Sequence, residues 1–135
     1  LSIKISKYWS SENSLSYTFG KDKTNNTPMD HIPPIYGKSS LVWVKNYQSL
    51  RCYLLFNGWK KMESYSVNGS DNPEEATIDG TPSWWTINIS YSKDINTNLT
   101  GLFGIENLLD VHYKAYSSGI SAAGRNFTFS LLATF

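Results

Sequence analysis

Two clusters of side chains in this sequence carry the chemistry of a ligand-binding site. The first is aromatic and basic, and it consists of Trp59, Lys60, Lys61, Glu63 and Tyr65. The second follows later in the chain and consists of His112, Tyr113, Lys114 and Tyr116. Ammonium groups attract anions and aromatic rings offer flat apolar surfaces, so the first cluster could bind an anionic chelate or a protein partner. The alternatives are a solvated loop for the first cluster and a structural turn for the second.

No arrangement of residues in the sequence predicts a metal site or catalysis. The acidic residues that could hold calcium are Asp71, Glu74, Glu75 and Asp79. They lack the regular spacing of a calcium loop, so a plain acidic loop is the preferred interpretation. His31 is interpreted as a rim residue and Cys52 as a small apolar filler, because each is isolated. Nucleophile elbows and glycine-rich phosphate loops are missing from the sequence, so we predict a protein that is not an enzyme and has no cofactor.

Composition excludes further classes of protein. The 12 Lys and Arg residues are scattered and balanced by 11 Asp and Glu, which argues against nucleic-acid binding. The longest apolar run, Cys52 to Phe56, is far shorter than the roughly 18 residues of a membrane-spanning helix. The chain opens at Leu1 without a methionine or a signal peptide, so we expect a fragment of a longer protein.

The elements that must position these side chains are β-strands. Apolar and polar residues alternate through the last eleven residues and through 14–20, 84–92 and 98–106. Successive side chains of a strand point to opposite faces, so each segment has one apolar and one polar face. Weaker alternation marks 1–9, 38–45 and 50–58, and the facing of 38–45 is ambiguous. The sequence therefore predicts an all-β protein of about seven strands.

The connections alternate between short turns and long loops. Short turns are expected at Ser10–Asn13, Lys45–Ser49 and Lys93–Thr97, and long loops at 21–37, 59–83 and 108–124. Short turns join antiparallel neighbours, so the strands form an up-and-down meander with every long loop at one end. That asymmetry, together with aromatic residues at both strand ends, is typical of an outer-membrane β-barrel. Rings that fill a soluble core are the alternative explanation of the aromatic residues.

Four segments resemble one family of membrane proteins. Residues 104–113, GIENLLDVHY, resemble the NLFD-x-x-Y signature near the C-terminus of TonB-dependent outer-membrane receptors. Residues 118–127, SGISAAGRNF, resemble the SGI-x-APGR-x-F ending of such receptors from Bacteroides-like bacteria, with Ala123 where proline is commoner. Residues 30–37 and 80–89 resemble the N-x-P-P and G-x-P-x-W segments of that family. Phe135, after alternating apolar residues, resembles the signal read by the barrel assembly machinery.

This resemblance implies a fold and a function. Residues 1–135 would be the last third of a 22-stranded transmembrane β-barrel, with its plug domain and earlier strands absent. The receptor would lie in the bacterial outer membrane and take up a scarce ligand, such as a ferric siderophore, haem, cobalamin or a glycan. Its implied partners are lipid, the remaining strands and plug, the barrel assembly machinery, a surface lipoprotein and the TonB energy-coupling complex through the absent N-terminal region.

The resemblance also assigns the two faces of the strands. The lipid-facing residues and assembly signal would be Phe127, Phe129, Leu131, Ala133, Phe135, Trp85, Ile87, Ile89 and Tyr91, with Leu15, Tyr17, Phe19, Leu99, Phe103 and Ile105. The Ser, Thr and Asn residues between them would line the lumen. Within the first motif, Asp110 and Tyr113 are interpreted as completing a turn at the rim. Asn107 is explained equally well by a buried bend or by a ligand contact.

Two other classes of protein remain open. A secreted β-sandwich could use exposed Trp and Tyr rings to bind carbohydrate. An adhesin-like structural protein is the third possibility. A sandwich would bury Phe129, Ile87 and Phe103 together in a dry core, whereas a barrel would leave them on its outer surface.

Overall fold

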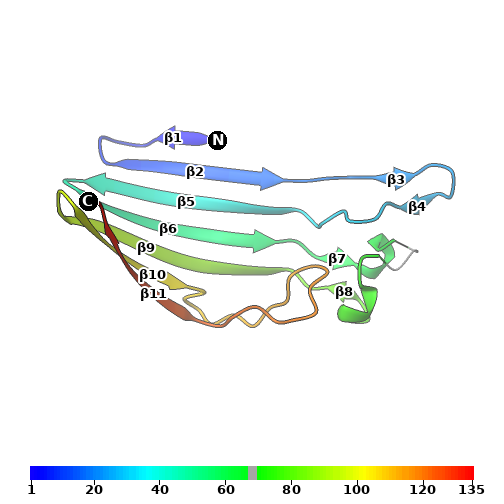
Figure 1. The fold of residues 1–135 in the computed structure, drawn as a ribbon. Coiled ribbons are helices and arrows are strands. Elements are labelled where there is room, and N and C mark those ends of the chain that lie inside the picture. Colours follow the sequence, from blue (N-terminus) through cyan, green and yellow to red (C-terminus); the bar gives the residue numbers. More distant parts are fainter. Residues whose placement is uncertain (67–69) are drawn as a thin grey trace.

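The computed structural model describes residues 1–66 and 70–135 and contains one seven-stranded sheet with the order β1-β2-β5-β6-β9-β10-β11 (Figure 1). Its strands are β1 (Ser2–Lys4), β2 (Trp9–Ser16), β5 (Tyr36–Lys45), β6 (Gln48–Asn57), β9 (Trp84–Asn96), β10 (Leu99–Glu106) and β11 (Asn126–Ala133). Every pair of neighbours in the sheet is antiparallel. The predicted all-β antiparallel meander is confirmed.

The short turns lie at one end of the sheet and the long connections at the other, as Figure 1 shows. The predicted turn at Ser10–Asn13 is wrong, because these residues belong to β2 and the chain reverses just before Trp9. The N–H groups of Ile5 and Ser6 donate to the Trp9 carbonyl at 2.9 and 3.1 Å. The polar run resembled a turn in composition, but Glu12 forms an ion pair with Arg51 of β6 and Asn13 accepts a hydrogen bond from Ser39 of β5.

Short ladders extend into the predicted loops. The pairs are β3 (Lys21–Asp22) with β4 (Thr27–Pro28), and β7 (Lys60–Lys61) with β8 (Gly80–Thr81). Two 3-10 helices, η1 (Met62–Ser64) and η2 (Pro73–Glu75), lie between β7 and β8. Elements of two or three residues are too short to show a period, so the sequence did not predict them. No helix among the described residues is long and apolar enough to cross a membrane.

The ladder register assigns each side chain to a face. Directly opposed residues in antiparallel strands point the same way. One row joins Leu41, Cys52, Ile89, Ile105 and Phe127 across five strands. We call the side of this row the apolar face. The next row along the strands joins Val42, Arg51, Ser90, Gly104 and Thr128, and we call its side the polar face.

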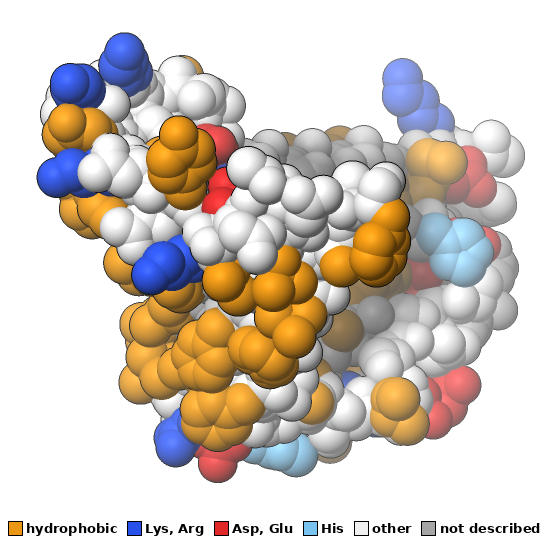
Figure 2. Space-filling view, turned by 60° about the vertical axis from the view of Figure 1, so that its left-hand side comes forward, with side chains coloured by type: hydrophobic (Ala, Val, Ile, Leu, Met, Phe, Trp, Pro, Cys, Tyr) orange, Lys and Arg blue, Asp and Glu red, His pale blue; other side chains and the backbone are white. Residues whose placement is uncertain are grey.

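The apolar face is the exposed one. Phe129 is 72% exposed and Phe103 42%, and Figure 2 shows hydrophobic side chains gathered over one continuous area of the surface. On the polar face, Ser40, Thr86 and Asn88 are buried. Among the described residues, the buried hydrophobic side chains are those of Val42, Tyr65 and Pro34, and of these only Val42 lies in the sheet. The sheet therefore has no apolar core within the described parts of the chain.

The ambiguous strand at 38–45 is resolved by its register. Leu41 and Trp43 lie on the apolar face, because they pair with Cys52 and Leu50. Val42 lies on the polar face opposite Arg51, whose guanidinium forms an ion pair with Glu12 of β2. A strand that is apolar on both sides carries no alternation, so only its partners could decide its orientation.

Candidate functional site

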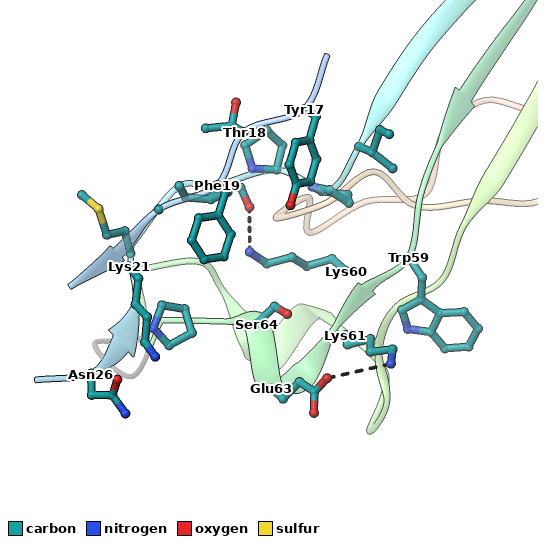
Figure 3. Close-up of a pocket in the computed structure, with 17 residues that line it drawn as sticks. Tyr17, Thr18, Phe19, Lys21, Asn26, Trp59, Lys60, Lys61, Glu63 and Ser64 are labelled. Carbon is teal, nitrogen blue, oxygen red and sulfur yellow. Dashed lines mark hydrogen bonds and ion pairs between the residues drawn. The ribbon is translucent and has the colours of Figure 1, made fainter. Parts of the chain in front are cut away.

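A cavity of about 570 Å³ lies at the long-loop end of the sheet. One wall is the connection from β2 to β5, which contributes Tyr17, Phe19 and Lys21. The opposite wall is the segment after β6, including Trp59, Lys60 and Lys61. In Figure 3, Lys60 reaches across the cavity toward the segment of Phe19, while Trp59 points away from it. The first predicted cluster thus lies beside a cavity whose second wall the sequence analysis did not identify.

The walls of this cavity are held by an extension of the main sheet. The β7–β8 pair Lys60–Thr81 keeps the register of the β6–β9 pair Asn57–Trp84. Gly80 has a φ of +105°, and a Cβ there would lie 2.1 Å from the Lys60 carbonyl oxygen. Only glycine fits this position, because other residues disfavour that φ and the backbone leaves no space. Gly80 thereby sets the bend that brings the acidic loop back onto Lys60.

Lys60 is a buried cation. Its Nζ donates to the Ile32 carbonyl at 2.6 Å and lies 5.6 and 5.1 Å from the ring centroids of Tyr65 and Tyr116. Burial lowers the pKa of Lys60, while the charge of Asp71 opposes the shift. An ammonium held by two rings and a carbonyl is stabilised where it lies. Lys60 therefore joins three loops, and its charge faces inward.

Asp71 is the acidic partner in the same cluster and is fully buried. It accepts hydrogen bonds from the backbone N–H groups of His31 at 2.7 Å and Ser66 at 3.2 Å. Burial opposes ionisation, but the Tyr116 hydroxyl, these two N–H groups and Lys60 outweigh it and lower the pKa of Asp71. Burial and the Asp71 carboxylate together raise the pKa of Tyr116. A single carboxylate thus fastens segments far apart in the sequence.

The two predicted clusters meet at this point. The rings of Tyr65 and Tyr116 pack edge to face with centroids 5.7 Å apart, and the Tyr65 hydroxyl bonds to Thr81 Oγ1 at 2.7 Å. Tyr65 and Lys60 are buried, so they support the loop rather than face solvent. Trp59 is 50% exposed, and its Nε1 donates to the Asp79 carbonyl. Of Trp59, Lys60 and Tyr65, Trp59 is therefore the predicted ligand residue that a solute can reach most directly.

The remaining residues of the second cluster lie in the last long loop, between β10 and β11. Tyr113 stacks on Trp84 with ring centroids 4.1 Å apart, and Lys114 Nζ bonds to Glu75 Oε2 at 2.7 Å. His112 is exposed. The contacts of Tyr113 and Lys114 tie this loop to β9 and to η2. Their predicted role as ligand contacts stays a prediction.

The acidic residues do not assemble a metal site. Asp71 bonds to backbone N–H groups and Glu75 to Lys114, while Glu74 and Asp79 are exposed. Over residues 1–66 and 70–135, no three His, Cys, Asp or Glu side chains gather to hold an ion. His31 lies beside Asp71, with Nδ1 3.6 Å from Oδ1, but its imidazole is largely exposed. The arrangement favours the plain acidic loop.

Asn107 forms the bend at the end of β10. It is buried with a φ of 48°, and its amide bonds to the Val111 carbonyl, the Ala123 carbonyl and the Val111 N–H. Asp110 Oδ1 accepts the Arg125 N–H at 2.7 Å, which ties the loop to the start of β11. All polar atoms of the Asn107 amide are used within the chain. These bonds favour the structural interpretation of both motif residues.

Replacing Asn107 with alanine is expected to loosen the loop at 108–124. Three side-chain hydrogen bonds are lost, at about 1 kcal/mol each, and alanine disfavours the positive φ. Limited proteolysis of the folded protein should cleave this loop at least tenfold faster. Asn107→Gly separates the two effects, because glycine accepts the φ without restoring the bonds. Equal cleavage of wild type and Asn107→Ala would contradict this role.

Comparison with known proteins identifies the fold. No protein-family model and no curated protein matches the sequence. The copper transporter OprC matches with a TM-score of 0.86 at 17% identity, over 99% of this chain and 22% of that chain. The ferric enterobactin receptor PfeA, in a ligand complex, matches with a TM-score of 0.75 at 21% identity, over 100% of this chain and 21% of the receptor.

A mutant of the ferric enterobactin receptor from Pseudomonas aeruginosa matches with a TM-score of 0.70 at 21% identity, over 99% of this chain and 21% of that chain. The chain thus spans about a fifth of the length of these proteins. At such identities the common property is the arrangement of strands. The chain therefore has the fold of one segment of a copper transporter and of ferric enterobactin receptors.

Proposed function

We propose that residues 1–135 form part of the wall of a TonB-dependent outer-membrane receptor, as the last third of its 22-stranded barrel. The observation that carries this proposal is the exposed apolar face, because a water-soluble protein would have to bury such side chains. Acyl chains would cover Phe127, Phe129, Leu131 and Ala133 of β11. Trp85, Ile87, Ile89 and Tyr91 of β9 lie on the same face and would also contact lipid.

The two ends of the sheet support a closed barrel. β1 and β11 each have a neighbour on one side only, so one edge of each strand is unpaired. Unpaired backbone groups are costly in lipid, and closure removes them. We infer that the earlier strands of the receptor cover these edges and that its plug lies against the polar face. Coupling to TonB would pass through the N-terminal region, and assembly would use the chain end at Phe135.

The secreted β-sandwich is not favoured by the fold. A sandwich packs two sheets through their apolar faces, with a core about 10 Å thick. Here Phe103 and Phe129 are exposed, although they oppose each other in neighbouring strands. One curved sheet supplies no second layer within the described residues. The apolar face needs a cover from outside the chain, and lipid is the cover we propose.

The proposed activity is uptake of a scarce ligand through this barrel, with the loop-end cavity contributing to capture. Trp59 offers a flat exposed surface beside the cavity, although its ring points away from the interior, and Lys21 and Lys61 bring positive charge to the cavity walls. Lys61 forms an exposed ion pair with Glu63, in which Nζ lies 3.8 Å from Oε1. An anionic ligand with planar groups fits this chemistry better than a neutral glycan does. We therefore favour a ferric siderophore or haem over cobalamin and glycans, and a surface lipoprotein remains a proposed partner of these loops.

Binding of a ferric tris-catecholate complex to the intact receptor tests this assignment. The double variant Trp59→Ala, Lys61→Glu is expected to weaken binding about tenfold, which corresponds to roughly 1.4 kcal/mol. Tyr47→Ala, which removes an exposed ring at the short-turn end, serves as the control. Unchanged affinity in the double variant would remove the surface formed by Trp59 and Lys61 from the proposal. Recovery of the wild-type receptor as a soluble monomer without detergent would overturn the membrane function itself.

A further inference from the structure

Charged side chains are segregated between the two faces of the seven-stranded sheet. The register places Lys45 and Lys93 on the apolar face, opposite Gln48 in the strand between them. The other charged residues of these strands lie on the polar face, and they are Lys4, Glu12, Lys38, Arg51, Asp94 and Glu106. Within the described strands, the apolar face thus carries charge only at its short-turn end, and that charge is positive.

These lysines follow an aromatic row. This row joins Trp9, Trp43, Leu50 and Tyr91 across β2, β5, β6 and β9. Along β5, β6 and β9 it lies two residues from Lys45, Gln48 and Lys93, on the same face. The Tyr91 hydroxyl donates to Gln48 Oε1 at 2.7 Å, so the polar tip of the ring points toward the lysine row. Aliphatic residues, amphipathic rings and cations therefore succeed one another along the strands. The same order holds across a bilayer, from acyl chains through the interface to the phosphates.

A third lysine joins this end of the sheet through a shared ring. Lys7 Nζ lies 5.2 Å and Lys45 Nζ 5.3 Å from the centroid of the Tyr8 ring. The ion pairs of the described residues involve none of Lys7, Lys45 and Lys93. Asp94, the acid next to Lys93, lies on the polar face and accepts a hydrogen bond from Thr100. We call Lys7, Lys45 and Lys93 the lysine collar.

We propose that the lysine collar binds the headgroups of anionic phospholipids in the leaflet nearest the short turns. This inference rests on the proposed function, because it requires the apolar face to contact acyl chains. The phosphate would lie between the ammonium groups, and the acyl chains would run along Trp43 and Tyr91. Continuity with the apolar face selects a lipid over free phosphate. The short turns of such barrels face the periplasm, so the leaflet is the inner one.

The test uses the intact receptor, reconstituted with equal amounts of phosphatidylglycerol and phosphatidylethanolamine. Native mass spectrometry then counts the lipids that remain bound after extraction. Wild type is expected to retain phosphatidylglycerol preferentially. The double variant Lys45→Gln, Lys93→Gln should reduce this preference about tenfold, because each lysine near an anionic surface raises the affinity several-fold. The matched control, Lys4→Gln, Lys38→Gln, removes the same charge from the polar face and should leave the preference unchanged.

Three outcomes contradict the proposal in distinguishable ways. Equal retention of both lipids by wild type overturns the collar while leaving the barrel intact. Displacement of phosphatidylglycerol by millimolar inorganic phosphate shows a free-anion site and overturns the choice of lipid. Flotation of the same samples with liposomes reports insertion independently. Wild type that fails to float overturns the proposed function, and the collar with it.

Discussion

Replacing Leu131 with arginine is expected to block assembly of the proposed receptor into the outer membrane, whereas replacing the adjacent Ser130 is not. Leu131 lies on the apolar face, pairs with Gly101 and is 58% exposed. A charged side chain that faces lipid costs about 2–4 kcal/mol at the centre of the bilayer. The measurement is the fraction of receptor that migrates as a folded, heat-modifiable species in outer-membrane preparations.

Ser130→Arg is the matched control, because it places the same charge one residue away at almost the same depth. Ser130 pairs with Leu102 on the polar face, where a guanidinium could reach water in the lumen of the proposed barrel. Its folded fraction should stay near that of wild type. If both variants assembled equally well, the proposed assignment of the two faces would be wrong. The test needs no knowledge of the ligand.

Replacing Asp71 with asparagine is expected to release the loops at the opposite end of the sheet. The buried carboxylate accepts hydrogen bonds from the N–H groups of His31 and Ser66, and its negative charge attracts the Lys60 ammonium. Hydrogen bonds to a charged acceptor contribute about 1.5–3 kcal/mol each, so the loss should reach about 3 kcal/mol locally. Hydrogen exchange of the His31 and Ser66 amides should then accelerate at least a hundredfold. Exchange of the amides in the seven-stranded sheet is expected to stay unchanged.

The same contact predicts a dependence on pH. The pKa of Asp71 is lowered in the folded protein, so its contribution to the stability of the loops is complete above the ordinary carboxyl pKa of about 3.9. The contribution is lost as the pH falls through the lowered pKa. Amide protection at His31 should therefore persist from pH 7 to about pH 4 and decline below it. Glu74→Gln, in the exposed part of the same loop, should change neither quantity, and equal protection in Asp71→Asn and wild type would contradict the role of the carboxylate.

Part of the candidate site was visible in the sequence and part was not. Trp59, Lys60 and Tyr65 stood out by residue type, and so did Tyr113 and Tyr116. The sequence could not show that the Lys60 ammonium lies within 6 Å of the rings of both Tyr65 and Tyr116. Nor could it show that Asp71, an ordinary member of an acidic loop, is the buried partner of His31. Contacts between long loops leave no periodic signal, because they depend on how separate segments meet in space.

The sequence by itself determined seven strands and their antiparallel pairing, but not all of their bounds, because the strand expected at 14–20 is β2, Trp9–Ser16. Alternation over eight or more residues is a local property, and short turns force antiparallel neighbours. It also separated the two faces in β9 and β11, where apolar and polar residues alternate through 85–92 and 126–131. Its failure at Ser10–Asn13 has a local cause too. A polar run resembles a turn in the sequence, because the residues that pair with it, Arg51 for Glu12 and Ser39 for Asn13, lie in other strands.

Only the tertiary structure decided which face is exposed and how the loops join. Alternation is symmetric, so a sandwich and a barrel wall share one sequence pattern, and the packing distinguishes them. The single sheet leaves Phe129 and Phe103 exposed and buries Thr86 and Asn88. The register likewise fixed Lys45 and Lys93 on one face, although 48 residues separate them in the chain. Such positions are set by hydrogen bonding between strands, which no single strand encodes.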